Sequence, residues 1–167
     1  IVAITGINDA PVVAMDTIAM QEDATVTATG NILFNDSDVD QGDVLTVADA
    51  GLRSGNYGSL ALAADGNYTY SVDSTSAAVQ SLGRTAQVSE HFGYTVTDGI
   101  AAVPSTLDIF LDGMNDAPIL ATPLTNQDFT FNKPFSWQMP SGSFTDIDQG
   151  DTLDYMATLA DDLPLPD

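Results

Sequence analysis

The chain has 167 residues, no cysteine and a net charge of −21, because 24 acidic residues oppose only three basic ones. This charge excludes binding to nucleic-acid phosphates, and the lack of cysteine excludes disulfides and thiolate metal sites. The apolar fraction of 44% is typical of a globular chain, but no apolar run approaches the roughly 18 residues that cross a bilayer. We therefore expect a folded, soluble segment without membrane insertion.

Apolar and polar residues alternate along most of the chain, between Gly, Asn and Asp residues that are typical of turns. The pattern predicts seven strands, at residues 12–20, 24–33, 44–48, 58–63, 68–72, 91–97 and 102–111. Asp65-Gly66-Asn67 predicts a tight hairpin between two of them. Residues 74–82, with a Ser/Thr start and Gly83 after the end, predict one short helix. Together these elements predict an all-β, immunoglobulin-like Greek-key β-sandwich.

Two sequence motifs occur twice at almost the same interval. Gly-Ile-Asn-Asp-Ala-Pro at 6–11 returns as Gly-Met-Asn-Asp-Ala-Pro at 113–118, and Asp-Val-Asp-Gln-Gly-Asp at 38–43 returns as Asp-Ile-Asp-Gln-Gly-Asp at 146–151. A period of this length predicts domain-sized units in tandem. We therefore divide the chain into the last strand of a preceding repeat with its linker (1–10), a complete repeat (11–117) and an incomplete next repeat (118–167).

The acidic residues favour calcium rather than a general acidic surface. Only Glu22 and Glu90 are glutamates among the 24, and the aspartates gather in short groups at predicted loops. Asp favours turns and holds its carboxylate close to the backbone, and clustered side-chain oxygens are the ligands that Ca²⁺ prefers. A solvated, halophile-type surface is the alternative, but we expect such a surface to use glutamate freely and to scatter its charges.

The order of the strands predicts which loops meet. If consecutive strands run antiparallel, the loops alternate between the two ends of the sandwich. The oxygen-bearing residues expected at the first end are Asn8, Asp9, Asp36, Asp38, Asp40 and Asp98. Those expected at the second end are Glu22, Glu90, Asp112, Asn115 and Asp116, where they would meet Asp146 and Asp148 of the next unit.

Several segments carry a family resemblance. Asn-Asp-Ala-Pro at 8–11, Gln-Glu-Asp at 21–23, the aspartate loop at 35–45 and Phe-Gly-Tyr-Thr-Val-Thr-Asp-Gly at 92–99 resemble a VCBS repeat, a bacterial cadherin-like domain, over residues 1–118. Residues 119–167 resemble the start of a dystroglycan-type cadherin-like repeat. Phe129, Phe131, Phe135 and Trp137 are expected to be core residues of that second module.

The resemblance implies calcium at the domain junctions. Matched by motif, the ligands are Glu22, Asn115, Asp116, Asp146 and Asp148 at one junction and Asn8, Asp9, Asp38, Asp40 and Asp98 at the other. The linker Asp-Gly-Met-Asn at 112–115 is one residue longer than the usual cadherin spacing, which makes Asp112 the least secure ligand. The implied function is a calcium-stiffened spacer or adhesion module of a large secreted bacterial surface protein.

The implied partners are neighbouring repeats and a surface or matrix polysaccharide or protein. A carbohydrate-binding module is the alternative, because Tyr57, Tyr68 and Tyr70 could stack on sugar rings. An EF-hand does not fit, because position 12 of the loop that starts at Asp36 is Val47 rather than Glu. No nucleophile or phosphate-loop motif supports an enzyme. Open strand edges in residues 1–5 and 119–167 predict strand-exchange self-association.

Overall fold

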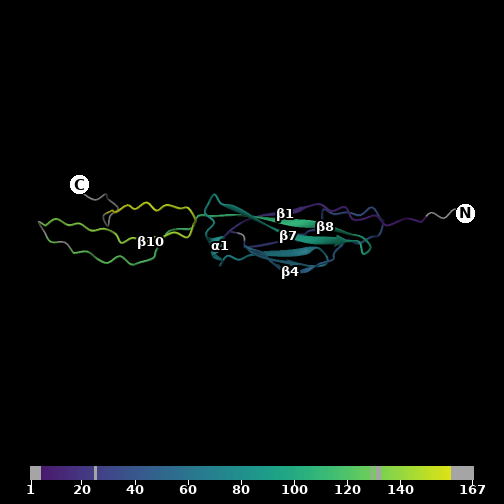
Figure 1. Cartoon of the computed structure of the whole chain (residues 1–167), viewed down its shortest axis with the longest axis horizontal. Coiled ribbons are helices and arrows are strands. Elements are labelled where there is room, and N and C mark those ends of the chain that lie inside the picture. Colours follow the sequence, from purple (N-terminus) through teal and green to yellow (C-terminus); the bar gives the residue numbers. More distant parts are fainter. Residues whose placement is uncertain (1–4, 25, 129, 131–132, 159–167) are drawn as a thin grey trace.

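Residues 5–24, 26–128, 130 and 133–158 are described by the structure, which is a computed structural model. The chain is elongated, with a β-sandwich on the N-terminal side and a thinner C-terminal segment beyond it (Figure 1). Residues 1–4, most of the expected strand of a preceding repeat, lie outside the described residues, as do Phe129 and Phe131.

Eight strands form two four-stranded sheets, which confirms the predicted β-sandwich. The first sheet has the order β1 (Asp16–Gln21), β8 (Ala102–Asp112), β7 (Gln87–Thr97) and β3 (Thr46–Val47). The second sheet has the order β2 (Thr27–Asn31), β6 (Asn67–Val72), β5 (Gly58–Leu62) and β4 (Gly51–Ser54).

The core lies between the two sheets. Leu60 and Tyr70 of the second sheet are completely buried, and Leu107 and Ile109 of the first sheet are 1% exposed. The rings of Tyr70 and Phe92 meet across the core with centroids 5.9 Å apart. Burial of each large apolar side chain contributes about 1.5–3 kcal/mol, so the alternating inward residues of both sheets hold the sandwich together.

The observed strands differ most from the predicted ones at three places. The first strand, β1, begins at Asp16 rather than at residue 12, and it pairs in parallel with β8. Val12 forms only an isolated bridge with Ser37. The short strand β4 was not predicted, because it lacks a buried apolar face and its Leu52 is 84% exposed. β7 starts at Gln87, four residues before the predicted boundary.

The hairpin and the short helix are where the sequence predicts them. Gly66, between β5 and β6, has a φ of 83°, which a glycine adopts without steric cost. Helix α1 (Ala77–Gln80) is shorter than the predicted 74–82. The Ser76 side chain caps it by accepting a hydrogen bond of 3.2 Å from the Val79 amide. The helix lies at the end of the sandwich that adjoins the C-terminal segment (Figure 1).

The C-terminal segment has little regular structure in its described residues. β9 (Ile119–Leu120) and β10 (Phe144–Thr145) pair antiparallel, with Ile119 opposite Thr145. This bridge repeats the one between Val12 and Ser37 at an offset of 107 and 108 residues. The described part of this segment is therefore built like the start of the sandwich.

Candidate metal-binding sites at the ends of the module

One cluster of carboxylates lies at the N-terminal end of the sandwich. Asp38, Asp43 and Asp98 each offer an oxygen atom within 4.8 Å of the others, and we call this group the N-terminal site. Asp38 and Asp43 come from the loop before β3, and Asp98 follows β7. Strand pairing brings them together, because Thr46 of β3 pairs with Thr97 of β7.

The first linker is held against the N-terminal site. The Asn8 side chain donates a hydrogen bond of 2.9 Å to Asp98 Oδ2, and the Asp9 amide donates one of 2.7 Å to Asp40 Oδ2. The Asp40 amide in turn donates to Asp38 Oδ1 at 2.9 Å. The hydrogen bond from Asn8, followed by backbone donors, lowers the pKa of Asp98. The structure thus brings together five of the six residues expected at this end.

A second cluster lies where the sandwich meets the C-terminal segment. Asp146, Asp148 and Asp151 offer oxygen atoms within 4.8 Å of one another, and we call this group the junction site. The Asp116 amide of the second linker donates a hydrogen bond of 2.8 Å to Asp148 Oδ2. The Asp148 amide donates one of 3.0 Å to Asp146 Oδ1.

Glu22 joins the junction site from the sandwich. The residue is completely buried, and its Oε1 accepts a hydrogen bond of 2.6 Å from the Met114 amide. Burial raises its pKa, and the charges of Asp23, Asp116 and Asp148 add to the rise. Burial and the same acidic surroundings also raise the pKa of Asp116. The junction therefore holds several carboxylates close together, and the charge of each one opposes the ionisation of its neighbours.

The two sites share their hydrogen-bond geometry. The pair formed by Asp9 and Asp40 corresponds to the pair formed by Asp116 and Asp148, with distances of 2.7 and 2.8 Å. Each second aspartate also bonds to the first aspartate of its Asp-x-Asp motif, at 2.9 and 3.0 Å. The repeated motifs therefore fold into two copies of one local structure.

The chemistry of both sites fits a calcium ion. Oxygen atoms of five carboxylates are buried without a hydrogen-bond partner among the described residues: Glu22 Oε2, Asp116 Oδ2 and Asp148 Oδ1 at the junction, and Asp36 Oδ2 and Asp38 Oδ2 in the first aspartate loop. Burying a carboxylate oxygen without a partner is costly, and a cation removes that cost. Ca²⁺ accepts six to eight oxygen ligands in tolerant geometry, which the mixture of carboxylates, amides and carbonyls can supply.

Three expected ligands have hydrogen-bond partners outside the clusters. Both oxygens of Glu90 accept hydrogen bonds, Oε2 from the Asn56 amide at 2.7 Å and Oε1 from the Tyr70 hydroxyl. Glu90 is therefore a buried structural acid rather than part of the junction site. Asp112 accepts a hydrogen bond of 2.6 Å from the Gln87 side chain.

Asp36, the third of these residues, accepts a hydrogen bond of 2.8 Å from the Ala14 amide. The side chain of Asn115, another expected ligand, donates a hydrogen bond to the Asp116 carbonyl within the linker.

Three residues of the sites were not expected from the sequence. Asp43 and Asp151 complete the two clusters, and both are the last residue of the repeated Asp-x-Asp-Gln-Gly-Asp motif. The repetition was a signal that could have identified them. Asp23, which has a φ of 58°, lies close enough to Glu22 and Asp116 to raise the pKa of both.

The comparison with known families agrees with this architecture. Residues 8–113 match the family model of the bacterial cadherin-like domain. The chain belongs to this family. The match begins at Asn8 of the first linker and ends at Gly113 of the second. No curated protein matches the chain.

The family narrows the class of function. Cadherin-like domains are typically structural or adhesive modules and are usually extracellular. Among the described residues, no helix has the length and apolar character that crossing a membrane requires.

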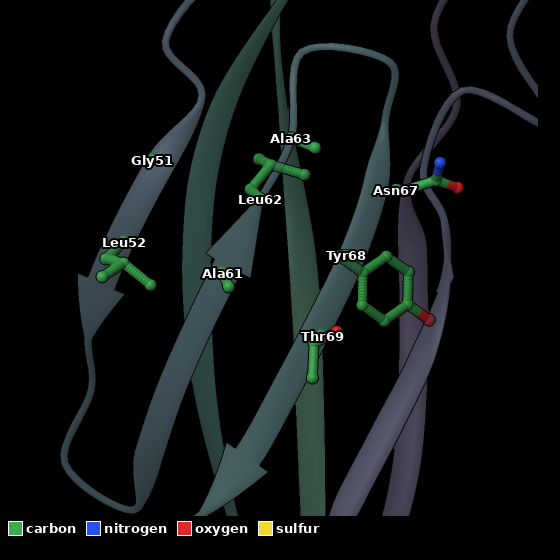
Figure 2. Close-up of a pocket in the computed structure, with 8 residues that line it drawn as sticks. All are labelled: Gly51, Leu52, Ala61, Leu62, Ala63, Asn67, Tyr68 and Thr69. Atoms are coloured by element: carbon green, nitrogen blue, oxygen red, sulfur yellow. The ribbon is translucent and has the colours of Figure 1, made fainter.

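Two of the three tyrosines that the carbohydrate alternative names are less accessible than stacking on a sugar ring requires. Tyr70 is completely buried in the core, so it cannot stack on a sugar ring. Tyr57 is partly buried against the core. Tyr68 borders a hollow over strands β4, β5 and β6, where its ring lies toward β2 and its hydroxyl closely approaches Gly30 (Figure 2). Of the three, Tyr68 alone lines this hollow.

Proposed function

We propose that this chain is a calcium-binding segment of a tandem-repeat bacterial surface protein, in which calcium at the module ends stiffens the array as a spacer or adhesion module. The observation that carries the proposal is the set of buried, unpartnered carboxylate oxygens of Glu22, Asp116 and Asp148 at the junction. Two carboxylates about 4 Å apart repel by about 4 kcal/mol at an effective dielectric constant near 20. Without a cation, this repulsion destabilises the junction.

The proposal includes secretion and the neighbouring repeats as partners. Calcium sites of extracellular modules have dissociation constants of about 10⁻⁴–10⁻³ M, so the sites fill in calcium-rich surroundings and stay empty in a cytoplasm. The second module begins near Pro118, as supported by the matching bridges of Val12 with Ser37 and of Ile119 with Thr145. The net charge of −21 argues against nucleic acid as a partner.

Calcium-dependent melting and scattering test the proposal. We expect calcium to raise the melting temperature and the maximum dimension of the chain in small-angle scattering, and magnesium to do so less, because Mg²⁺ demands stricter octahedral geometry. Asp38→Ala combined with Asp40→Ala should weaken binding at the N-terminal site. An exposed carboxylate of the β5–β6 hairpin provides the control, Asp65→Ala. Melting and scattering that do not change on chelation would contradict the proposal.

The hollow beside Tyr68 supports carbohydrate binding as a second candidate. Leu52 and Ala61 line its floor together with Thr69 (Figure 2), and Leu52 is 84% exposed. Apolar side chains beside an aromatic ring fit the apolar face of a sugar. A glycan array tests this candidate, with Tyr68→Ala as the variant. Absence of any signal from bacterial polysaccharides would exclude it.

A further inference from the structure

Helix α1 and the turn after it, residues 77–83, belong to neither carboxylate cluster, yet they lie beside the junction (Figure 1). Val79 is completely buried and Leu82 is 8% exposed, so the core of the sandwich anchors this segment. The Ser76 cap fixes the start of the helix. The carbonyl groups at its end therefore have fixed positions relative to the core.

Three of these carbonyl groups contact the linker or the second module. The Ser81 carbonyl accepts a hydrogen bond of 3.0 Å from the Gln149 amide. Gly113, the first residue of the linker, lies so close to the Leu82 and Gly83 carbonyl oxygens that a Cβ atom at Gly113 would overlap both. Only glycine allows the linker to pass at this distance from the turn.

Residues 80–83 make two further contacts beside the junction. A Cβ atom at Gly83 would lie 3.6 Å from the Asp148 Cβ, in van der Waals contact, so the two backbones pass close to each other. The Gln80 side chain donates a hydrogen bond of 3.2 Å to Asp23 Oδ1. It also lines a cleft together with Ile119 and Ile147 of the C-terminal segment.

The first copy of the motifs lacks these contacts among the described residues. Gly6 corresponds to Gly113, but a Cβ atom there would meet nothing within 4 Å. Gln41 corresponds to Gln149 and is exposed. Within this chain, Gly6 and Gln41 therefore provide matched control positions for Gly113 and Gln149.

We propose that residues 80–83 form a clamp that holds the second module against the sandwich without a bound metal and so preorganises the junction site. This inference rests on the proposed function, because preorganised carboxylates matter only if the site binds a cation. The Ser81 and Gly113 contacts are uncharged hydrogen bonds and van der Waals contacts, so chelation does not remove them. The clamp opposes the repulsion among the carboxylates, so the ligands are already close together when the ion binds.

Spin-label distances in the full chain test the clamp. The chain has no cysteine, so labels can be placed specifically at the exposed positions Thr69→Cys and Thr125→Cys. We compare distance distributions in excess chelator for Gly113→Ala and for the matched control Gly6→Ala. We expect the control to keep the distribution of the parent and Gly113→Ala to lose its main peak. Coincident distributions for the two variants would overturn the clamp.

A second pair of variants covers the case in which Gly113→Ala fails to fold. Gln149→Pro removes the amide that donates to the Ser81 carbonyl, and Gln41→Pro makes the same change in the first copy of the loop. We expect only Gln149→Pro to broaden the distribution in chelator, and equal broadening would overturn the clamp. Calcium titrations of the same proteins separate the two proposals, because a chain that binds no calcium contradicts the proposed function while the comparison in chelator still tests the clamp.

Discussion

The amide of Asp116 donates a hydrogen bond of 2.8 Å to the carboxylate of Asp148, which joins the linker to the loop that follows β10. The hydrogen bond leaves Asp148 Oδ1 buried and without a partner among the described residues, and Asp148 is 5% exposed. The arrangement satisfies one oxygen through the backbone and leaves the other for a further ligand. A divalent cation is the ligand that best suits several such oxygens in one place.

Glu22→Gln should weaken calcium binding at the junction site. The substitution keeps the shape of the side chain but removes the charge of a completely buried carboxylate, and the charge of the ligands sets the affinity of calcium sites. We expect a loss of about tenfold, or about 1.4 kcal/mol, measured by isothermal titration calorimetry. Glu90→Gln is the matched control and should leave calcium binding unchanged. Equal losses for the two variants would contradict the assignment of Glu22.

In the absence of calcium, stability should fall as the pH rises above 4.5, the ordinary pKa of a glutamate such as Glu22. The raised pKa values of Glu22 and Asp116 mean that the folded state keeps protons that the unfolded state has already released. Stability from these groups is therefore present at lower pH and is lost as the pH rises through the raised values. The lowered pKa of Asp98 has the opposite effect on stability, and only at a pH near or below 3.8, the ordinary pKa of an aspartate.

Thermal melts between pH 4.5 and neutrality check this dependence. With chelator, the melting temperature should decrease across the range. With calcium, the decrease should disappear or reverse, because the ion stabilises the ionised carboxylates that the protons otherwise neutralise. A melting temperature in chelator that rises steadily toward neutral pH would contradict the proposed crowding of charges at Glu22 and Asp116.

The sandwich could be predicted from the sequence because its strands alternate clearly. β6 places Tyr70 and Val72 inward and Ser71 between them, which is the period of two expected of a half-buried strand. The strand β4 could not be predicted, because Leu52 points away from the core and the apolar pattern is absent. The parallel pairing of β1 with β8 depends on tertiary packing, which no local pattern encodes.

The candidate sites were partly predictable for a similar reason. Residues such as Asp38 and Asp146 lie in repeated motifs, and strand order places those motifs at the module ends. The position of Glu90 could not be deduced from strand order, because that order gives the end of the sandwich and not the direction of the side chain. Glu90 lies at an inward position of β7, where Tyr70 is available as a donor.

Tyr70→Phe should destabilise the module without affecting calcium. The hydroxyl donates to Glu90 Oε1 inside the core, and burial, together with this contact, raises the pKa of Tyr70. Loss of the donor leaves a buried carboxylate oxygen without its partner, which costs about 1–3 kcal/mol. Urea denaturation in chelator measures the loss, with Tyr68→Phe as the control at a half-buried ring. A Tyr70→Phe variant as stable as the control would contradict a structural role for the pair of Tyr70 and Glu90.

The exposed apolar side chains of the C-terminal segment should drive self-association at high protein concentration. Trp137 and Phe144 line an apolar hollow there together with Tyr155, and Trp137 and Tyr155 are 41% and 57% exposed. Contiguous exposed apolar surface favours association, and the strand pair β9–β10 offers edges that have no partner strand among the described residues.

Trp137 is the single tryptophan of the chain, so its fluorescence reports this association directly. We expect the emission to shift to shorter wavelengths as the protein concentration rises, in parallel with a larger sedimentation coefficient. Trp137→Ser should reduce the association, whereas Leu52→Ser removes a more exposed apolar residue from the sandwich and should not. A chain that sediments as a monomer at all concentrations would show that this surface does not associate with a second copy.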